Sequence, residues 1–142
     1  MAADYFSSQL TSIDAGAIQP ATIGIYKFGP KDRPVYRGSF STGSVISGKT
    51  IEMVRLPVGV IPWRVSLLID TTTGSSTLAV GSSVTAAKYR AAATLTTINQ
   101  WFSYMILPLA ALTVEELVWI TIGSATMPAT YNLELAVEAI VP

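Results

Sequence analysis

The chain contains neither cysteine nor histidine among its 142 residues. Without cysteine it has no disulfide framework and no thiolate nucleophile, and without either residue it has no zinc site of the usual kind. Histidine is also the side chain that enzymes use most often as a general base. The sequence therefore argues against an enzyme, and we expect neither a metal site nor a cofactor.

Charge is also scarce, because only 13% of the residues are charged while 50% are hydrophobic, and the net charge is zero. Soluble globular domains usually carry about 25% charged residues. The longest uncharged run, 91–114, is interrupted by threonine, asparagine and glutamine and by Pro108. It does not suit a membrane-spanning helix, which needs about 20 mostly apolar residues. We therefore expect no membrane and a surface that is partly buried against other protein.

The first 34 residues differ from the rest of the chain. Tyr5, Phe6 and Leu10 are apolar anchors spaced along polar sequence without sustained periodicity. We predict an extended N-terminal arm over residues 1–34 that docks on a neighbouring molecule, followed by a single domain over residues 35–142.

Short runs rich in β-branched and aromatic residues alternate with turns rich in glycine, serine, threonine and proline, which is typical of β-strands. In the last run, "LELAVEAIV", leucine, valine and alanine alternate with Glu134 and Glu138, as in a half-buried strand. A helix could fit only in 86–105, where β-branched residues oppose a long one. Strands are expected at 21–28, 51–56, 63–69, 76–80, 116–122 and 133–141, and "VYRGSFST" (35–42) is at best an edge strand.

Many short strands without βα alternation predict an all-β fold. We expect an antiparallel β-sandwich, jelly-roll-like, with about eight strands and the extended N-terminal arm.

The stretch "GSVISGKT" (43–50) has the letters of a phosphate-binding P-loop, and "VSLLID" could supply a magnesium ligand at Asp70. A P-loop needs a helix after it, however, and Pro57 and Pro62 exclude a continuous helix there. We predict a polar loop between two β-segments and no nucleotide binding.

The carboxylates do not form a catalytic pair. Glu115 and Glu116 are adjacent and point to opposite faces of a strand. Glu134 and Glu138 share a face but lie about 13 Å apart, beyond the roughly 5–9.5 Å of glycosidase carboxylates.

Charge is unevenly placed along the chain. Seven basic and two acidic residues lie between 27 and 64, whereas 91–142 contains four acidic residues and no basic one. This asymmetry suits head-to-tail contacts between copies or a basic face on an acidic partner. Nucleic acid is a weaker interpretation, because the chain is neutral overall.

Aromatic and basic side chains are the candidate interface residues, since tryptophan, tyrosine and arginine are enriched at protein interfaces. Because Trp101 and Phe102 are adjacent in extended chain, at least one of them should meet something outside the local sheet. The candidates are Tyr5, Phe6, Leu10, Lys31, Arg33, Arg37, Trp63, Trp101, Phe102 and Tyr104.

The stretches 54–95, with "LPVG", "TLAVG" and "KYRAAAT", and 118–141, with "TIGSA" before the alternating strand, resemble head decoration or cement proteins of tailed bacteriophages. The resemblance covers residues 50–141. It implies a non-enzymatic protein, made in the host cytoplasm, that binds the exterior of a capsid and stabilises the major capsid protein lattice, with itself as a further partner in a dimer or trimer. An alternative is a phage tail or fibre protein whose β-sandwich binds a host glycan.

Overall fold

The computed structural model describes residues 5–6, 27–28, 33–42, 45–128 and 130–142. Every regular element in these ranges is a strand, and no helix there has the length and apolarity needed to cross a membrane. The strands are β1 (Tyr5–Phe6), β2 (Lys27–Phe28), β3 (Val35–Thr42), β4 (Thr50–Leu56), β5 (Ile61–Ile69), β6 (Thr77–Ser82), β7 (Arg90–Ala93), β8 (Phe102–Met105), β9 (Glu116–Gly123) and β10 (Tyr131–Ile140).

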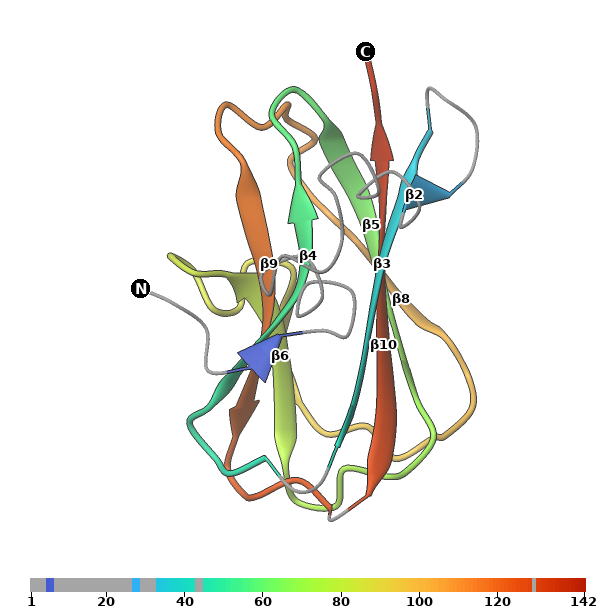
Figure 1. Ribbon diagram of the computed structural model, residues 1–142, viewed down its shortest axis with the longest axis vertical. Coiled ribbons are helices and arrows are strands. Elements are labelled where there is room, and N and C mark those ends of the chain that lie inside the picture. Colours follow the sequence, from blue (N-terminus) through green and yellow to red (C-terminus); the bar gives the residue numbers. More distant parts are fainter. Residues whose placement is uncertain (1–4, 7–26, 29–32, 43–44, 129) are drawn as a thin grey trace, which may run out of the picture.

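The strands form two sheets that lie face to face as two layers (Figure 1). Sheet A has the order β1-β4-β9-β6-β7, and sheet B has the order β2-β3-β10-β5-β8. All pairs are antiparallel except β1 with β4, in which the two-residue β1 runs parallel to the edge of sheet A. The short β1 and β2 lie at one edge of each sheet.

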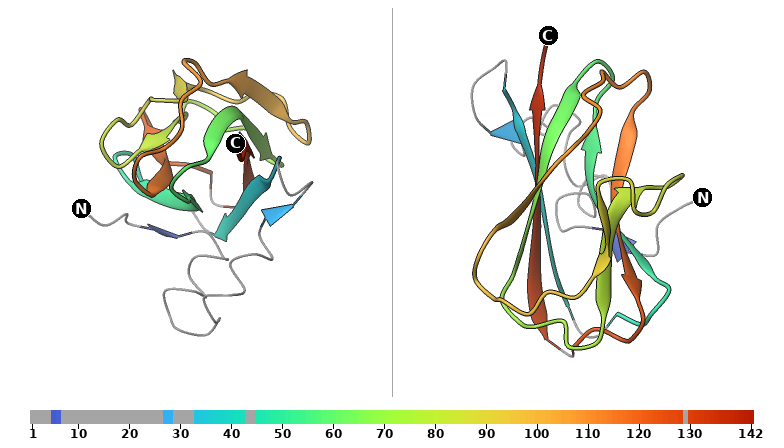
Figure 2. Two further views of the ribbon diagram at one scale, coloured as in Figure 1. Left: turned by 90° about the horizontal axis from the view of Figure 1, so that it is seen from above. Right: turned by 180° about the vertical axis from the view of Figure 1, so that it is seen from behind.

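The eight strands from β3 to β10 follow the jelly-roll order, in which the first strand pairs with the last and the second with the last but one. Thus β3 pairs with β10 in sheet B, and β4 pairs with β9 in sheet A. Figure 2 shows the two layers from above and from behind. The predicted jelly-roll-like antiparallel sandwich is confirmed.

The core lies between the sheets because each long strand buries alternate side chains. In β10, Leu133, Leu135 and Val137 are fully buried, whereas Glu134 and Glu138 point to the outer face and are half-buried. This confirms the period of two predicted from the sequence. Burial of this continuous aliphatic layer supplies most of the driving force for folding.

One side of the sandwich closes where β3 approaches β4. A Cβ atom added to Gly38 would stand 2.2 Å from the carbonyl oxygen of Met53. The pairing of β4 with β9 shifts register between Glu52 and Val54, so Met53 is an extra residue at a bulge. Glycine is required at position 38 because the neighbouring backbone occupies the place of a side chain.

Most of the expected strands are confirmed. The segments that need comment are 35–42, 86–105 and 21–28, where the sequence pattern was weakest or the structure describes only part. The segment "VYRGSFST" forms β3, which pairs along its whole length with β10 and with only the two residues of β2 on its other side. The only place considered for a helix, 86–105, instead contains β7 and β8. Of the strand expected at 21–28, only Lys27–Phe28 falls within the described residues.

A cluster of hydrogen bonds joins the end of β5 to the start of β10. Asp70, just after β5, accepts from the backbone amide of Asn132 at 2.7 Å and from its side-chain amide at 2.5 Å. The hydroxyl of Thr71 also donates to Asp70 at 3.1 Å. These bonds, first of all the one from the backbone amide of Asn132, lower the pKa of Asp70 below its ordinary value.

We expect Gly38→Ala to destabilise the fold by about 1–3 kcal/mol, because the new methyl group must displace the backbone of Met53. Alanine would otherwise be the better residue in a strand, by roughly 0.5–1 kcal/mol. Urea denaturation measures the difference, and Ser41→Ala on the same strand is an exposed control. Equal midpoints for Gly38→Ala and the wild type would contradict the close approach of β3 and β4.

We expect the Asp70 carboxylate to stabilise the protein above the unfolded-state pKa of about 3.9, and this contribution to disappear as the pH falls through the lower folded-state pKa. Asp70→Asn should therefore be less stable than the wild type at pH 7, and the gap should shrink on acidification. Urea midpoints of both proteins between pH 7 and pH 2.5 measure this gap. A gap independent of pH would show that the hydrogen bonds of the ionised carboxylate are not its source.

Candidate docking surfaces

The outer face of sheet B carries a row of small side chains between larger ones. Register places Arg37 of β3 beside Ala136 of β10, Ala136 beside Ser66 of β5, and Ser66 beside Ser103 of β8. The hydroxyls of Ser66 and Ser103 are hydrogen-bonded at 2.8 Å. Ala136 and Ser66 are almost completely buried although they face outward. Larger neighbouring side chains therefore cover the middle of this face.

Two arginine–tryptophan contacts lie on this face. The guanidinium carbon of Arg37 stands 5.2 Å from the ring centre of Trp101, and that of Arg64 stands 4.8 Å from the ring centre of Trp63. Trp101 directly precedes β8, whereas Arg37 belongs to β3, three strand spacings or about 14 Å away across the sheet. The Arg37 and Trp101 side chains therefore meet over the small residues between their strands.

Each arginine is also paired with a glutamate of β10. Arg64 binds Glu138 through two nitrogens, at 2.5 and 2.6 Å, and this pairing raises the pKa of Arg64 above its ordinary value. Arg37 lies 3.7 Å from Glu134, and both side chains are more than two-fifths exposed. Exposed pairs such as Arg37–Glu134 contribute only about 0–1 kcal/mol to stability. The main effect of the two arginine–glutamate pairs is to leave the outer face of sheet B with little net charge.

These ion pairs bear on one part of the expectation drawn from the uneven charge along the chain, and head-to-tail contacts between copies stay a prediction. Two of the seven basic residues of 27–64, Arg37 on β3 and Arg64 on β5, lie beside β10 and pair with its Glu134 and Glu138 within the chain. Residues far apart in sequence thus cancel one another's charge. The described part of sheet B presents no basic face to an acidic partner.

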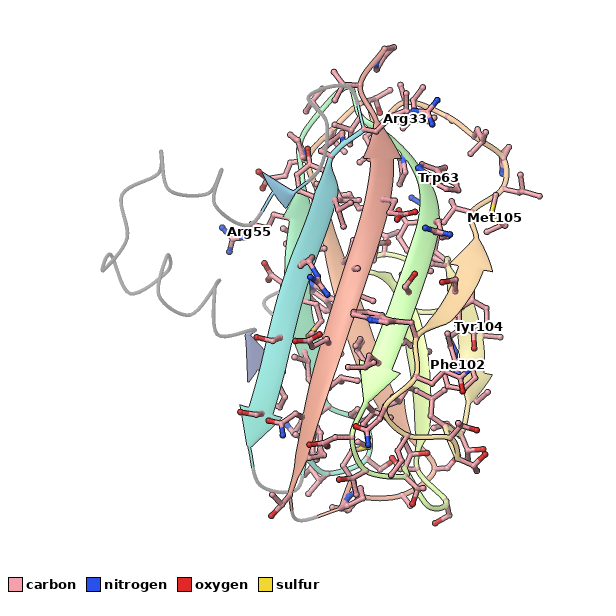
Figure 3. All side chains as sticks on the ribbon, turned by 90° about the vertical axis from the view of Figure 1, so that its right-hand side faces the viewer. Arg33, Arg55, Trp63, Phe102, Tyr104 and Met105 are labelled. Atoms are coloured by element: carbon pink, nitrogen blue, oxygen red, sulfur yellow. The ribbon has the colours of Figure 1, made fainter. Side chains whose placement is uncertain are left out.

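The predicted interface residues fall in different places. Figure 3 looks onto the outer face of sheet B, with Arg33 and Trp63 near one end of the sheet and Phe102 and Tyr104 on β8. Arg33 is exposed, and Trp101 is 37% exposed on the outer face.

Phe102 and Tyr104, by contrast, are half-buried and pack against the core between the sheets. The side chain of Trp101, the neighbour of Phe102 in the extended chain, contacts Arg37 of the same sheet. Contact of either ring with a partner stays a prediction.

The N-terminal candidates are described only in part. The backbone of Tyr5 pairs with Ile51 and that of Phe6 with Glu52, so this piece of the arm lies on the sheet of its own chain. Leu10 and Lys31 lie outside the described residues. Docking of the arm on a neighbour remains a prediction.

Exposed aliphatic side chains gather at one end of the sandwich, in the β4–β5 turn and the β8–β9 loop. We call this cluster the apolar tip; its members are Val58 (61% exposed), Leu107 (78%), Leu109 (53%) and Val114 (68%). Exposed aliphatic residues are ordinary when scattered singly, but a group of them marks an interaction site. The apolar tip is therefore the strongest candidate for a docking surface.

Backbone hydrogen bonds hold the two loops of the apolar tip together. The amide of Gly59 donates to the carbonyl of Leu112 at 2.8 Å, and the amide of Leu112 donates to the carbonyl of Val60 at 2.9 Å. A hollow of about 320 Å³ lies beside the β8–β9 loop, and its wall includes the ion-paired Lys88 and Glu116. The apolar tip is thus preorganised, so binding of a partner there would cost little conformational entropy.

Sequence reasoning missed the apolar tip. The run "MILPLAAL" (105–112) follows Trp101 closely, and its apolar character favours burial. The signal that could have revealed a loop is Pro108 within a short apolar run that lacks alternation.

The loop with the letters of a P-loop joins β3 to β4, as predicted. Gly48 adopts a positive φ of 88°, and its amide donates to the carbonyl of Ile122 at 2.8 Å. The amide of Lys49 donates to the carbonyl of Ile46, and Asp70 is engaged by Asn132. These two loop amides, which a P-loop would direct at phosphate, are thus committed to the protein's own backbone.

Among the described residues, no three side chains of the metal-binding types gather into a metal site.

Neither a protein-family model nor a curated protein matches the chain. Solved structures do match. A chain of the cyanophage Pam1 capsid asymmetric unit is 23% identical, with a TM-score of 0.68, over 81% of this chain and 90% of that one. A chain of the capsid of Ralstonia phage GP4 is 17% identical, with a TM-score of 0.64, over 80% of this chain and 87% of that one. This chain therefore shares its fold and approximate length with chains found in two phage capsids.

Proposed function

We propose that this protein is a non-enzymatic structural component of a phage virion: a decoration or cement protein that binds the outer surface of the head and stabilises the lattice of the major capsid protein. The observation that carries the proposal is the apolar tip, held rigidly at one end of a small sandwich whose fold occurs in two phage capsids.

The distribution of polar and apolar surface supports attachment by one end. A subunit that tiles a shell must contact neighbours around its perimeter, whereas the outer face of sheet B carries paired charges and the apolar tip is confined to two loops. A protein that binds only the assembled shell stabilises it by mass action. Repetition over a lattice then adds many such contacts.

The positions of the carboxylates favour a structural role over hydrolysis. Glu134 and Glu138 each pair with an arginine on the outer face, and Glu116 pairs with Lys88. Each of these three carboxylates is thus engaged by a cation of its own chain.

A tail or fibre protein that binds a host glycan is the second candidate. The observation in its favour is that Trp63 and Trp101 both contact arginines on the outer face of sheet B, where indole rings could stack on sugars. A guanidinium already covers part of each ring, which leaves less aromatic surface for a sugar. Glycan-array binding that is lost in Trp101→Ala would favour this candidate, and microscopy that locates the protein on the head would exclude it.

We expect Val58→Ser combined with Leu109→Ser to weaken binding to undecorated heads by about a hundredfold, since two aliphatic side chains would lose about 3 kcal/mol of burial. Co-sedimentation of the purified protein with heads measures the dissociation constant.

The matched control is Ile46→Ser combined with Ile98→Ser, which removes two exposed aliphatic side chains at the opposite end of the sandwich. This control should bind like the wild type. Equal loss in both double variants, or loss in neither, would rule out the apolar tip as the docking surface.

The predicted arm has a separate test. We expect deletion of residues 1–20 to weaken attachment to heads while β3 to β10 remain folded, because the sandwich core is built from those eight strands. Head binding and circular dichroism of the truncated protein measure the two effects. Unchanged affinity would show that the arm takes no part in attachment.

A further inference from the structure

The geometry points to an interaction surface of a different kind: the free edge of β8, which we propose pairs with the same edge of a second copy, in antiparallel register about a twofold axis at Tyr104. This pairing would join the B sheets of two molecules into one continuous sheet. It concerns the protein in solution and does not depend on attachment to a shell.

The first observation is that β8 has hydrogen-bonding groups to offer. It is the last strand of sheet B and pairs only with β5, with Tyr104 opposite Val65 and Met105 opposite Arg64. The amide of Ile106 donates to the carbonyl of Trp63, which fixes the side of the strand that faces β5. Because backbone groups of alternate residues point to opposite sides, those of Ser103 and Met105 point to the open edge.

No other described segment covers this edge. Apart from the strand ladders, no backbone hydrogen bond between described residues involves Ser103 or Met105. A groove of about 550 Å³ separates β8 from β7, the last strand of the opposite sheet. The exposed side chains of Ser103 and Met105 border this groove.

The second observation is that β8 lacks the features that normally prevent edge strands from pairing, which are charge, proline, bulges and cover by another segment. The sequence "FSYM" is uncharged and pairs with β5 without a register shift. The other edges differ. β4 pairs with the two residues of β1 and has a bulge, and β3 pairs with the two residues of β2 and carries a charge at Arg37. β7 has a register shift and carries Arg90, whose guanidinium binds the carbonyls of Leu78 and Ala93.

The third observation is that the edge is complementary to itself. A twofold axis at Tyr104 places Ser103 of one copy opposite Met105 of the other. The small serine side chain then lies beside the long methionine side chain, which is 60% exposed in the single chain. The same register places Trp101 opposite Leu107 of the second copy. All four residues lie at alternate positions and share the outer face with Ser66 and Arg64. The contact therefore repeats identically on both sides of the axis.

The area that a stable interface must bury also requires the side chains of Trp101, Met105 and Leu107. Two four-residue strands alone bury less than the roughly 1,200 Å² of a stable interface. Trp101, Met105 and Leu107 are all exposed, and the twofold pairing buries each of them twice, once in each copy. Hydrogen bonds between the two β8 strands fix the relative orientation of the two copies. The aromatic and aliphatic side chains supply the buried area of the contact.

Sedimentation velocity of the full chain tests the proposal first. We expect a concentration-dependent equilibrium between monomer and dimer. Met105→Lys should shift it to monomer, because a lysine on an edge strand opposes pairing. Val84→Lys places the same charge on an exposed valine in the β6–β7 loop and should leave the dimer intact. A monomer at all concentrations, a trimer, or a dimer insensitive to Met105→Lys would overturn the proposal.

Cross-linking tests the register, because the native chain has no cysteine and an introduced thiol has no internal partner. Ser103→Cys and Met105→Cys are prepared separately and mixed under mild oxidation. Residues directly opposite in a hydrogen-bonded antiparallel pair have Cα atoms about 5.5 Å apart, within reach of a disulfide. The mixture should form cross-linked dimer several-fold faster than either variant alone.

A mixture of Ile46→Cys and Ile98→Cys, exposed positions at the other end of the sandwich, gives the rate of random collision. Cross-linking of the first mixture at this rate would exclude the proposed register. Both readouts are made without phage heads, so failure here is distinct from failure of the proposed decoration function.

Discussion

The fold depends on the position of β10 between β3 and β5. The last strand of the chain holds the first long strand on one side and the third on the other, over eight residue pairs in each ladder. Its inner side chains Leu133, Leu135 and Val137 fill the core, and its outer carboxylates meet arginines on both neighbours. These are long-range contacts, so the two sheets can close only once the whole chain is present. Such non-local pairing is typical of slowly folding β-sandwiches.

The glutamates of β10 also set the net charge of the outer face of sheet B. Because Glu134 and Glu138 neutralise Arg37 and Arg64, the outer face of sheet B is a polar surface with little net charge, and its tryptophans lie partly beneath guanidinium groups. The surfaces whose groups lack a partner in the described structure therefore lie outside the outer face of sheet B. One is the apolar tip, where exposed aliphatic side chains lack a partner in the described structure, and the other is the edge of β8, where backbone groups lack one. Both border the β8–β9 loop, so one short segment lies beside both proposed contacts.

Several parts of the structure were predictable because they rest on local patterns. The alternation in 133–141 predicted β10, the turn residues predicted the loops between strands, and prolines 57 and 62 ruled out the helix that a P-loop needs. β7 and β8 were missed because "RAAA" and "FSYM" are short and carry little β-branched sequence. The burial of Phe102 and Tyr104 was missed for another reason. Their inward direction is set by pairing with β5, which is far away in sequence.

The sequence by itself determined the class of the fold and excluded whole groups of chemistry, because strand periodicity, turn residues and the absence of cysteine and histidine are local properties of the chain. Only the tertiary structure decided which residues meet. It paired two arginines of the basic segment with two glutamates of the acidic segment on one sheet, and it placed an apolar run at an exposed end of the sandwich. The physical reason is that charge neutralisation and exposure depend on distances between residues, and strand order sets those distances.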